Sequence, residues 1–523
     1  MWSEQTGKAK EPRGDGMAVT TFAAIDVGSY ELELTIYEIS PKKGINQLDR
    51  VRKIIGLGRD TYGRGVISHE RVDEMCRLLL KFKEIMSEYQ VDGYKAYGTS
   101  ALREAENREV VLDQIQVRTG IKIEILSNSE QRFLCYKAIA AKENEFNNMI
   151  QKGTAIAEVG SGSMQISLFD KDMLVTTQNL KLGALRIYQI LSGTGGTDAD
   201  KYQITQELIN NDIDTFQKLF LKDRNVKNII ATGVCALYLG RGAKSDRQRI
   251  TAEEFLNFYQ DLRTLSEAGI AEKYDIPAEY VALIVPGAMV YKKLIDVTGA
   301  ELLWLPGVRL GDGIAAEYAE QKKLIRFTHD FSGDIIAAAR IIAERYRCDK
   351  KHSAILEKNV LNLFDSMKKY HGLGKRERLL LQISAILHDC GKYISMRTPG
   401  ECAYNIILST EIIGISHKER EIIANVVKYN TLEFDYTADS VTLDKQMRIT
   451  IAKLTAILKI GNAIDRSHKQ KFKNIKVSVR DQQMVITTDS TENIMLEQSL
   501  FVPKADFFEE VYGIRPVLRR KKG

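Results

Sequence analysis

The sequence predicts an α/β protein in which two related domains enclose a cleft, followed by an all-helical domain and a small α+β module. Three observations support this prediction: an internal repeat near the start, helical periodicity from about residue 325, and a strand-like pattern after Lys471. At 523 residues the chain is also too long for one hydrophobic core. We place the domains at residues 17–145, 146–322, 323–470 and 471–523, after an extension of residues 1–16 that we expect to be disordered.

Composition narrows the class of protein. Hydrophobic residues make up 44% and charged residues 28% of the chain, which excludes wholesale disorder. The net charge of +6 is too small to predict a specific nucleic-acid partner, although it suits a polyanionic substrate held in a local groove. Six scattered cysteines without a C-x-x-C pair favour free thiols in a reducing compartment. Because no apolar run approaches the roughly 18 residues of a membrane helix, we expect a cytoplasmic protein with no membrane partner.

The strongest internal signal is a duplication. Residues 23–38 read AAIDVGSYELELTIYE, and residues 155–170 read AIAEVGSGSMQISLFD. Each copy contains an apolar strand, a carboxylate, a Gly-Ser turn and a second strand with alternating apolar residues, in the same order. Identical or similar residues occupy most aligned positions, so the sequence predicts one β-hairpin in each of two repeated domains.

The turn of each hairpin is suited to bind phosphate. Glycine lets backbone N–H groups approach an anion closely, and converging N–H groups form an anion-binding nest. The carboxylate before the turn, Asp26 or Glu158, would repel a phosphate but is well placed to hold Mg²⁺ or to order a water. Two such hairpins facing each other would hold a phosphate chain in the cleft. For either copy alone, a plain hairpin in which glycine only makes the turn is the alternative.

Four segments carry a resemblance to a known family. They are residues 26–31 (DVGSYE), 97–107 (YGTSALREAEN), 125–132 (ILSNSEQR) and 158–165 (EVGSGSMQ). They are similar to the motifs D-x-G-S-N-S, A-T-S-A-x-R-x-A-x-N, I-x-S-G-x-E-E-A and D-I-G-G-G-S-T-E of the Ppx/GppA phosphatases. The resemblance implies two actin-like domains, of the sugar kinase, Hsp70 and actin type, then a helical HD-like domain, in a homodimer. A sugar or acetate kinase would share the fold but not these segments.

The resemblance also implies a function and a site. The reaction would be hydrolysis of terminal phosphoanhydride bonds in inorganic polyphosphate or guanosine pentaphosphate, with Mg²⁺ offsetting the phosphate charge; it depends mostly on positioning and electrostatics. The implied catalytic residues are Arg103, Glu130, Gln131 and Glu158, and the implied Mg²⁺ ligands are Asp26 and Glu158. The implied phosphate-binding residues are Asp26, Gly28, Ser29, Ser100, Gly160, Ser161, Gly162 and Ser163.

The chain departs from the family pattern at acidic positions. Gln131 stands where the family has its catalytic glutamate, with Glu130 beside it, and Gln165 replaces the last glutamate of the second hairpin. A glutamine cannot accept a proton from water at neutral pH, and losing a general base typically costs about 10²–10⁴ in rate. Three hypotheses stay open: an enzyme whose base has moved to Glu130, a slow enzyme, and a sensor that binds polyphosphate or guanosine tetra- or pentaphosphate without turnover. The retained glycines and Arg103 favour the first two.

The helical half contains a second candidate site. His352, the pair His388-Asp389 and Asp465 occur in the order of the H…HD…D set of HD phosphohydrolases, which this segment resembles. The mixture of imidazole and carboxylate suits one divalent first-row metal ion or Mg²⁺. In Ppx/GppA relatives this domain chiefly narrows the substrate channel and builds the dimer. Metal-dependent hydrolysis of nucleotides by this half of the chain is an alternative function. A further alternative is a purely structural role, because an isolated His-Asp pair more often packs in a core or caps a helix.

Overall fold

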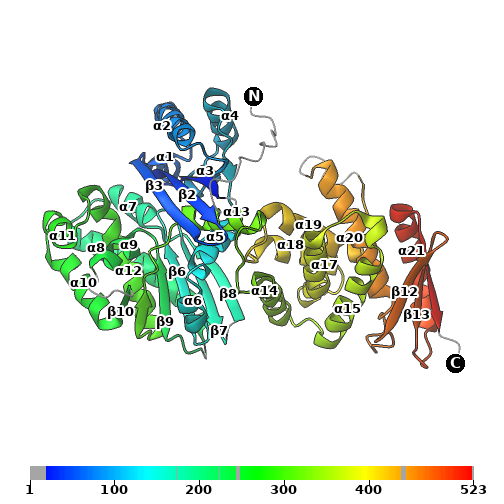
Figure 1. Cartoon of the computed structure of the whole chain (residues 1–523). Helices are drawn as coiled ribbons and strands as arrows, with labels where there is room; N and C mark the ends of the chain where they lie inside the picture. Colours follow the sequence, from blue (N-terminus) through cyan, green and yellow to red (C-terminus); the bar gives the residue numbers. More distant parts are fainter. Residues whose placement is uncertain (1–18, 172, 223, 243–247, 437–442, 521–523) are drawn as a thin grey trace. The chain divides into compact units, whose positions relative to one another are not determined.

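The computed structural model describes residues 19–520, apart from 172, 223, 243–247 and 437–442. The predicted extension of residues 1–16 lies outside the described residues. The chain divides into two compact units, residues 1–330 and 331–523 (Figure 1). The finer division at residues 145 and 470 stays a prediction.

The first unit is built on two mixed sheets. Its strands are β1 (Thr20–Val27), β2 (Glu31–Ser40), β3 (Gly44–Ile54), β4 (Gly93–Gly98), β5 (Glu124–Ile125), β6 (Thr154–Val159), β7 (Met164–Asp170), β8 (Met173–Leu180), β9 (Asn228–Thr232), β10 (Arg249–Thr251) and β11 (Leu302–Trp304). The five-stranded sheet has the order β3-β2-β1-β4-β5, and the six-stranded sheet has the order β10-β11-β9-β6-β7-β8. In each sheet a hairpin pairs with a following parallel strand, β4 or β9.

Helices pack against these sheets. They are α1 (Leu57–Arg64), α2 (His69–Glu88), α3 (Ser100–Glu104), α4 (Arg108–Thr119), α5 (Asn128–Ala140), α6 (Glu143–Ile150), α7 (Ala184–Ser192), α8 (Asp198–Phe216) with the π-helical turn η1 (Gln217–Leu221), α9 (Val234–Gly242), α10 (Ala252–Thr264), α11 (Glu267–Tyr274), α12 (Ala278–Thr298) and α13 (Leu310–Gln321). This α/β arrangement agrees with the predicted fold class of the front half.

The predicted duplication is confirmed by the register of the two hairpins. Aligned residues have equivalent cross-strand partners. For example, Asp26 pairs with Glu33 in the first hairpin, and Glu158 pairs with Gln165 in the second. In both turns the N–H of the glycine donates to a carbonyl at the far end of the turn, at 3.0 Å. The two copies are therefore the same structural unit, and each brings its carboxylate to the edge of its sheet.

The central strand β1 is buried on both faces. Ala23 and Ile25 belong to a core cluster with residues of α2, whereas Phe22 and Ala24 belong to a cluster with residues of α13. A strand covered on both faces has a continuous apolar run rather than an alternating one. This explains why the first strand of the repeat is apolar throughout, and it fixes the hairpin firmly in the core.

Gly313 lies where α13 crosses α5. A Cβ at this position would lie 2.1 Å from the Leu134 carbonyl oxygen, which is backbone and cannot turn away. We expect Gly313→Ala to lower the free energy of unfolding by about 1–3 kcal/mol, because the two helices must separate. Urea denaturation checks this, with Gly63→Ala in α1 as the control, since no described atom outside the adjoining backbone of α1 lies within 4 Å of a Cβ there. Equal stability of both variants would contradict the tight crossing.

The second unit is mainly helical and ends in a small sheet. Its elements are α14 (Phe331–Arg345), α15 (Lys350–Ser366), α16 (Lys368–His371), α17 (Lys375–Leu387), the 3₁₀ turn η2 (Cys390–Tyr393), α18 (Pro399–Ser409), α19 (His417–Thr431), α20 (Lys445–Ala463), β12 (Ile475–Arg480), β13 (Gln483–Thr488), α21 (Met495–Tyr512) and β14 (Arg515–Arg520). The sheet has the order β12-β13-β14. The predicted helical character is confirmed, while the HD-like class of these helices stays a prediction. Within the described residues, every helix is too short or too polar to cross a membrane.

Candidate active site

A cleft of about 130 Å³ lies in the first unit, between the two hairpins. Ten of the residues predicted for the site line it: Asp26, Gly28, Ser29, Ser100, Gln131, Glu158, Gly160, Ser161, Gly162 and Ser163. Arg103 and Glu130, the other two predicted residues of this site, are not among the described residues that line it. The structure thus brings together residues from distant segments, as the resemblance implies.

The sheet topology explains this convergence. Strands β1 and β4 run parallel, so the turn after β1 and the start of α3 after β4 lie at the same edge of the sheet. As a result, the Ser29 and Ser100 hydroxyl oxygens lie 2.9 Å apart. The equivalent strand β6 delivers the second turn in the same way from the other sheet.

A tyrosine that the sequence analysis missed completes this corner of the cleft. The Tyr62 hydroxyl lies 2.8 Å from the hydroxyl oxygens of both Ser29 and Ser100. A Cβ on Gly162 would lie 2.0 Å from the Tyr62 hydroxyl and 2.1 Å from the Ser100 hydroxyl. Glycine at position 162 therefore permits the close approach of the second turn to the first, which is a packing requirement as well as a means of binding anions.

Negative charge is concentrated in the cleft. Burial is the largest cause that raises the pKa of Asp26 well above its ordinary value. The neighbouring carboxylates Glu33, Glu31 and Glu158 raise the pKa of Asp26 further, and the Arg309 guanidinium lowers it. One oxygen each of Asp26 and Glu158 is buried without a hydrogen-bond partner among the described residues. Carboxylates that repel one another and have oxygens without hydrogen-bond partners suit a hard divalent cation such as Mg²⁺.

Arg309 is the cleft cation that the sequence analysis did not assign. Its Nη1 donates to Glu33 Oε2 at 3.1 Å and lies 3.5 Å from Glu31 Oε1. The residue lies just before α13 and more than two hundred positions after the first hairpin in the chain, so no local pattern connects them. A guanidinium in a phosphate-sized cleft is a potential phosphate ligand, because its planar donors match phosphate oxygens.

Gln131 lies beside Glu158 in the cleft. Its Nε2 donates to Glu158 Oε1 at 3.3 Å, and its own Oε1 is buried without a partner among the described residues. Burial raises the pKa of Glu158, and hydrogen bonds with Cys135 and Gln131 lower it in part. The position of the missing family glutamate is therefore occupied by an amide that keeps one acceptor oxygen available to a water molecule.

Glu130 has a different role from its neighbour. Its carboxylate accepts the Ser127 N–H at 3.0 Å, while the Ser127 hydroxyl oxygen accepts the Glu130 N–H at 3.2 Å. This reciprocal pair is a capping box at the start of α5. The hypothesis that the general base has moved to Glu130 would require that cap to open.

We expect Glu130→Gln to leave both the rate of phosphate release and the melting temperature nearly unchanged. Glutamine can replace glutamate in a capping box, since its side-chain oxygen also accepts the N-cap N–H. Phosphate release and thermal denaturation measure the two quantities. A rate lower by about 10²-fold or more, with unchanged stability, would instead assign proton acceptance to Glu130.

Arg103 holds the loop that leads into α5. Its guanidinium donates to the Leu126 carbonyl and to Asn128 Oδ1, both at 2.5 Å. Its positive charge also lowers the pKa of Glu158. These contacts support α5 and hence Gln131, while direct binding of phosphate by Arg103 stays a prediction.

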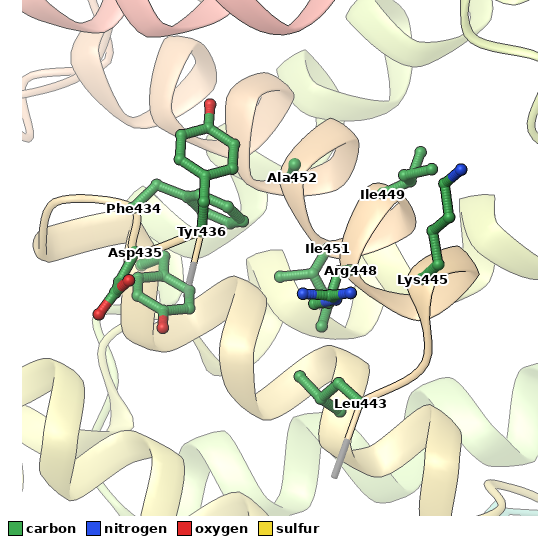
Figure 2. A pocket seen from close by; sticks show the side chains of 10 residues that line it. Phe434, Asp435, Tyr436, Leu443, Lys445, Arg448, Ile449, Ile451 and Ala452 are labelled. Atoms are coloured by element: carbon green, nitrogen blue, oxygen red, sulfur yellow. The ribbon is translucent and has the colours of Figure 1, made fainter. Parts of the chain in front are cut away.

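The second unit contains two further features. Potential ligand atoms of His352, His388 and Asp389 lie within 4.8 Å of one another, whereas Asp465 is not part of that group. Separately, a largely apolar hollow of about 190 Å³ lies beside α20. Figure 2 shows Phe434 and Tyr436 on one side of this hollow and Ile449 on the other.

Comparison with known proteins identifies relatives along most of the chain. Residues 35–320 match the model of the Ppx/GppA phosphatase family, and residues 336–503 match that of Ppx/GppA phosphatase, domain III. A guanosine-5'-triphosphate,3'-diphosphate pyrophosphatase of Photobacterium profundum is 19% identical over 472 residues, which cover 89% of this chain and 91% of the relative. A protein of the same name from Pseudoalteromonas translucida is 22% identical over 416 residues, covering 78% of this chain and 80% of the relative.

Solved structures show the same fold. The crystal structure of an exopolyphosphatase from Cytophaga hutchinsonii superposes with a TM-score of 0.52 at 16% identity, covering 58% of this chain and 99% of that chain. An exopolyphosphatase-like protein gives a TM-score of 0.50 at 18% identity, with the same coverage of both chains. The α/β fold with mixed sheets is therefore shared with solved exopolyphosphatase-type proteins.

Proposed function

Since the chain belongs to the Ppx/GppA phosphatase family, we propose that it is an acid anhydride hydrolase that releases terminal phosphate from inorganic polyphosphate. The observation that carries this proposal is the pair of equivalent glycine-serine turns, each preceded by a carboxylate, that line one cleft. Guanosine pentaphosphate is the competing substrate, because the two relatives named above that align along most of the chain are named for that class of nucleotide.

The terminal phosphates would lie between the two turns. Backbone N–H groups around Gly28 and Gly160 supply donors, and the hydroxyls of Ser161 and Ser163 lie in the same lining. Arg309 adds positive charge at the end of the cleft that contains the first hairpin. Such preorganised donors stabilise the charge that spreads over the transferred phosphoryl group.

Asp26 and Glu158 are the residues that would hold Mg²⁺. Each has one buried oxygen without a hydrogen-bond partner in the described part of the chain, and carboxylates are in excess around Arg309; both observations support this assignment. A bound Mg²⁺ would neutralise charge on the phosphate oxygens and make the leaving chain less basic. The carboxylates themselves would fix the position of the terminal phosphate relative to Gln131.

Gln131 would orient the attacking water rather than deprotonate it. Its Oε1, which has no partner among the residues that the structure describes, can accept one O–H of that water in the cleft, next to Glu158. Phosphoryl transfer depends mostly on positioning and electrostatics, so an orienting amide permits turnover, but without the gain of about 10²–10⁴ in rate that a general base supplies. We therefore favour a working but slow enzyme over one whose base has moved to Glu130, since the Glu130 carboxylate is bonded in the helix cap.

Phosphate release by the full chain tests the proposal. Long-chain polyphosphate and guanosine pentaphosphate are supplied separately with Mg²⁺, at enzyme concentrations high enough to detect slow turnover. We expect release from polyphosphate, its loss in Gly162→Ala and its retention in Gly63→Ala. A higher kcat/KM for guanosine pentaphosphate would move the substrate assignment to the nucleotide.

The sensor hypothesis is the alternative outcome of the same assay. Saturable polyphosphate binding without release of phosphate from either substrate would reject hydrolysis and favour a binding protein. The homodimer implied by the resemblance and the cytoplasmic location expected from the sequence remain predictions; sedimentation of the full chain measures the first.

A further inference from the structure

The second unit buries a compact cluster of side chains that can bind metal. One potential ligand atom each from His352, His388 and Asp389 lies within 4.8 Å of the others. His352 belongs to α15, and His388 ends α17, which packs against α15. These three residues are 0%, 3% and 9% exposed, in that order. We propose that the cluster binds one first-row divalent metal ion, independently of the phosphate cleft in the first unit.

The hydrogen bonds of the two histidines fix which nitrogen faces the cluster. His352 Nδ1 lies 2.7 Å from Asp465 Oδ2, and His388 Nδ1 lies 2.8 Å from the Ala385 carbonyl oxygen. Both partners are acceptors, which favours the tautomer in which each Nδ1 carries the proton and each Nε2 offers its lone pair. Metal-binding histidines in proteins are held in this way, with the second nitrogen bonded to a carboxylate or carbonyl.

Both Nε2 atoms have no hydrogen-bond partner among the described residues. The buried His371 of the same unit shows the contrast, because its Nε2 bonds the Phe364 carbonyl at 3.0 Å and its Nδ1 accepts the Leu373 N–H at 2.9 Å. Both ring nitrogens of His371 are thus bonded, whereas His352 and His388 are each bonded at Nδ1 only within the described part of the chain. Leaving a buried polar atom unbonded is costly, and a shared metal ion would satisfy both Nε2 atoms together.

Asp389 supplies the carboxylate of the cluster. Its Oδ2 lies 3.4 Å from His388 Nε2, a separation that suits two ligands of one ion. Two imidazole nitrogens with one carboxylate oxygen favour Mn²⁺, Fe²⁺, Co²⁺ or Zn²⁺ over Mg²⁺, which prefers oxygen ligands alone. With three protein ligands, the ion keeps a coordination position for water or for a phosphate oxygen.

Asp465 has a different role from the one its sequence position predicts. The sequence analysis places it among the ligands, but its Oδ2 bonds His352 Nδ1 and its Oδ1 accepts the Gln470 N–H at 2.8 Å. It is a positioning residue that holds the tautomer and direction of the His352 ring.

Lys392 competes with the metal ion for Asp389. Its ammonium donates to Asp389 Oδ2 at 2.6 Å. The Lys392 side chain is 32% exposed and belongs to the short turn η2, so it can move towards solvent when an ion binds. Removing this positive charge should therefore strengthen metal binding, an effect that a damaged fold would not produce.

Titration of the full chain with Mn²⁺ tests the proposal, with the loss of the free-ion EPR signal as the readout and no phosphate compound present. The titration is repeated on Glu158→Gln, so that any ion held by the phosphate cleft is recognised. We expect one ion per chain that persists in Glu158→Gln, with affinity reduced about tenfold or more in Asp389→Asn and His388→Gln, and increased several-fold in Lys392→Met. His417→Ala, at an exposed histidine of α19, is the matched control and should bind as the wild type does.

Two outcomes would overturn the proposal. One is no Mn²⁺ binding up to millimolar concentration in the wild type and in Lys392→Met. The other is binding that disappears in Glu158→Gln but is unchanged in Asp389→Asn. The Lys392→Met result decides the question if the histidine variants fail to give a native circular dichroism spectrum.

Discussion

Replacing Gln131 by glutamate should raise the rate of phosphate release by about 10²-fold or more. Gln131 lines the phosphate cleft, and its amide lies 3.3 Å from Glu158, so a carboxylate at this position would meet the attacking water. That carboxylate can accept the proton which the amide can only hydrogen-bond. Bound Mg²⁺ would offset the repulsion between the new carboxylate and Glu158. The measurement is kcat for phosphate release at saturating polyphosphate.

Gln165→Glu is the matched control for this gain. It also restores a carboxylate that the family motif contains, but Gln165 pairs across the hairpin with Glu158 and is not among the described residues that line the cleft. We expect no comparable rise in kcat. An unchanged or lower rate in Gln131→Glu, with native stability, would mean that proton acceptance by residue 131 does not limit turnover.

Glu158→Gln should lower kcat by about 10²–10³-fold while leaving the melting temperature unchanged or slightly higher. The substitution removes a carboxylate that would hold Mg²⁺, next to Gln131 and opposite Asp26. Stability should not fall, because burial already disfavours the charged form of Glu158 and raises its pKa. Parallel measurements of kcat and thermal unfolding separate the two effects.

The control for Glu158→Gln is the same chemical change at Glu130. That carboxylate caps α5 through the Ser127 N–H, so its loss should not slow hydrolysis. Equal losses of rate in both variants would contradict the division of roles between the two glutamates. A loss of rate in Glu130→Gln alone would support the hypothesis that Glu130 is the general base.

The repeated hairpin could be predicted because its signals are local. The apolar run of β1, the alternating second strand and the Gly-Ser turn all lie within residues 23–38, and the second copy repeats them. The capping role of Glu130 was readable too, since Ser127 and Glu130 have the S-x-x-E spacing of a capping box. Alignment with the family motif places Glu130 beside the catalytic position and hides this capping role.

Other features of the cleft depend on contacts between distant parts of the chain. Tyr62 and Arg309 reach the hairpins through the packing of α1 and the start of α13, and no periodicity marks either residue. The order of His352, His388 and Asp465 likewise predicted a cluster but not the roles within it. Those roles depend on the direction of each side chain: Asp465 bonds the Nδ1 of His352 and is not part of the group formed by His352, His388 and Asp389.

The most direct test of the central claim is ³¹P NMR of long-chain polyphosphate incubated with Mg²⁺ and the wild-type chain or Glu158→Gln. Removal of terminal phosphate by the cleft of the first unit predicts that inorganic phosphate accumulates while the number of chain ends stays constant, and that this accumulation is lost in Glu158→Gln. An increase in chain ends, or release by Glu158→Gln at the wild-type rate, would contradict terminal hydrolysis at this cleft.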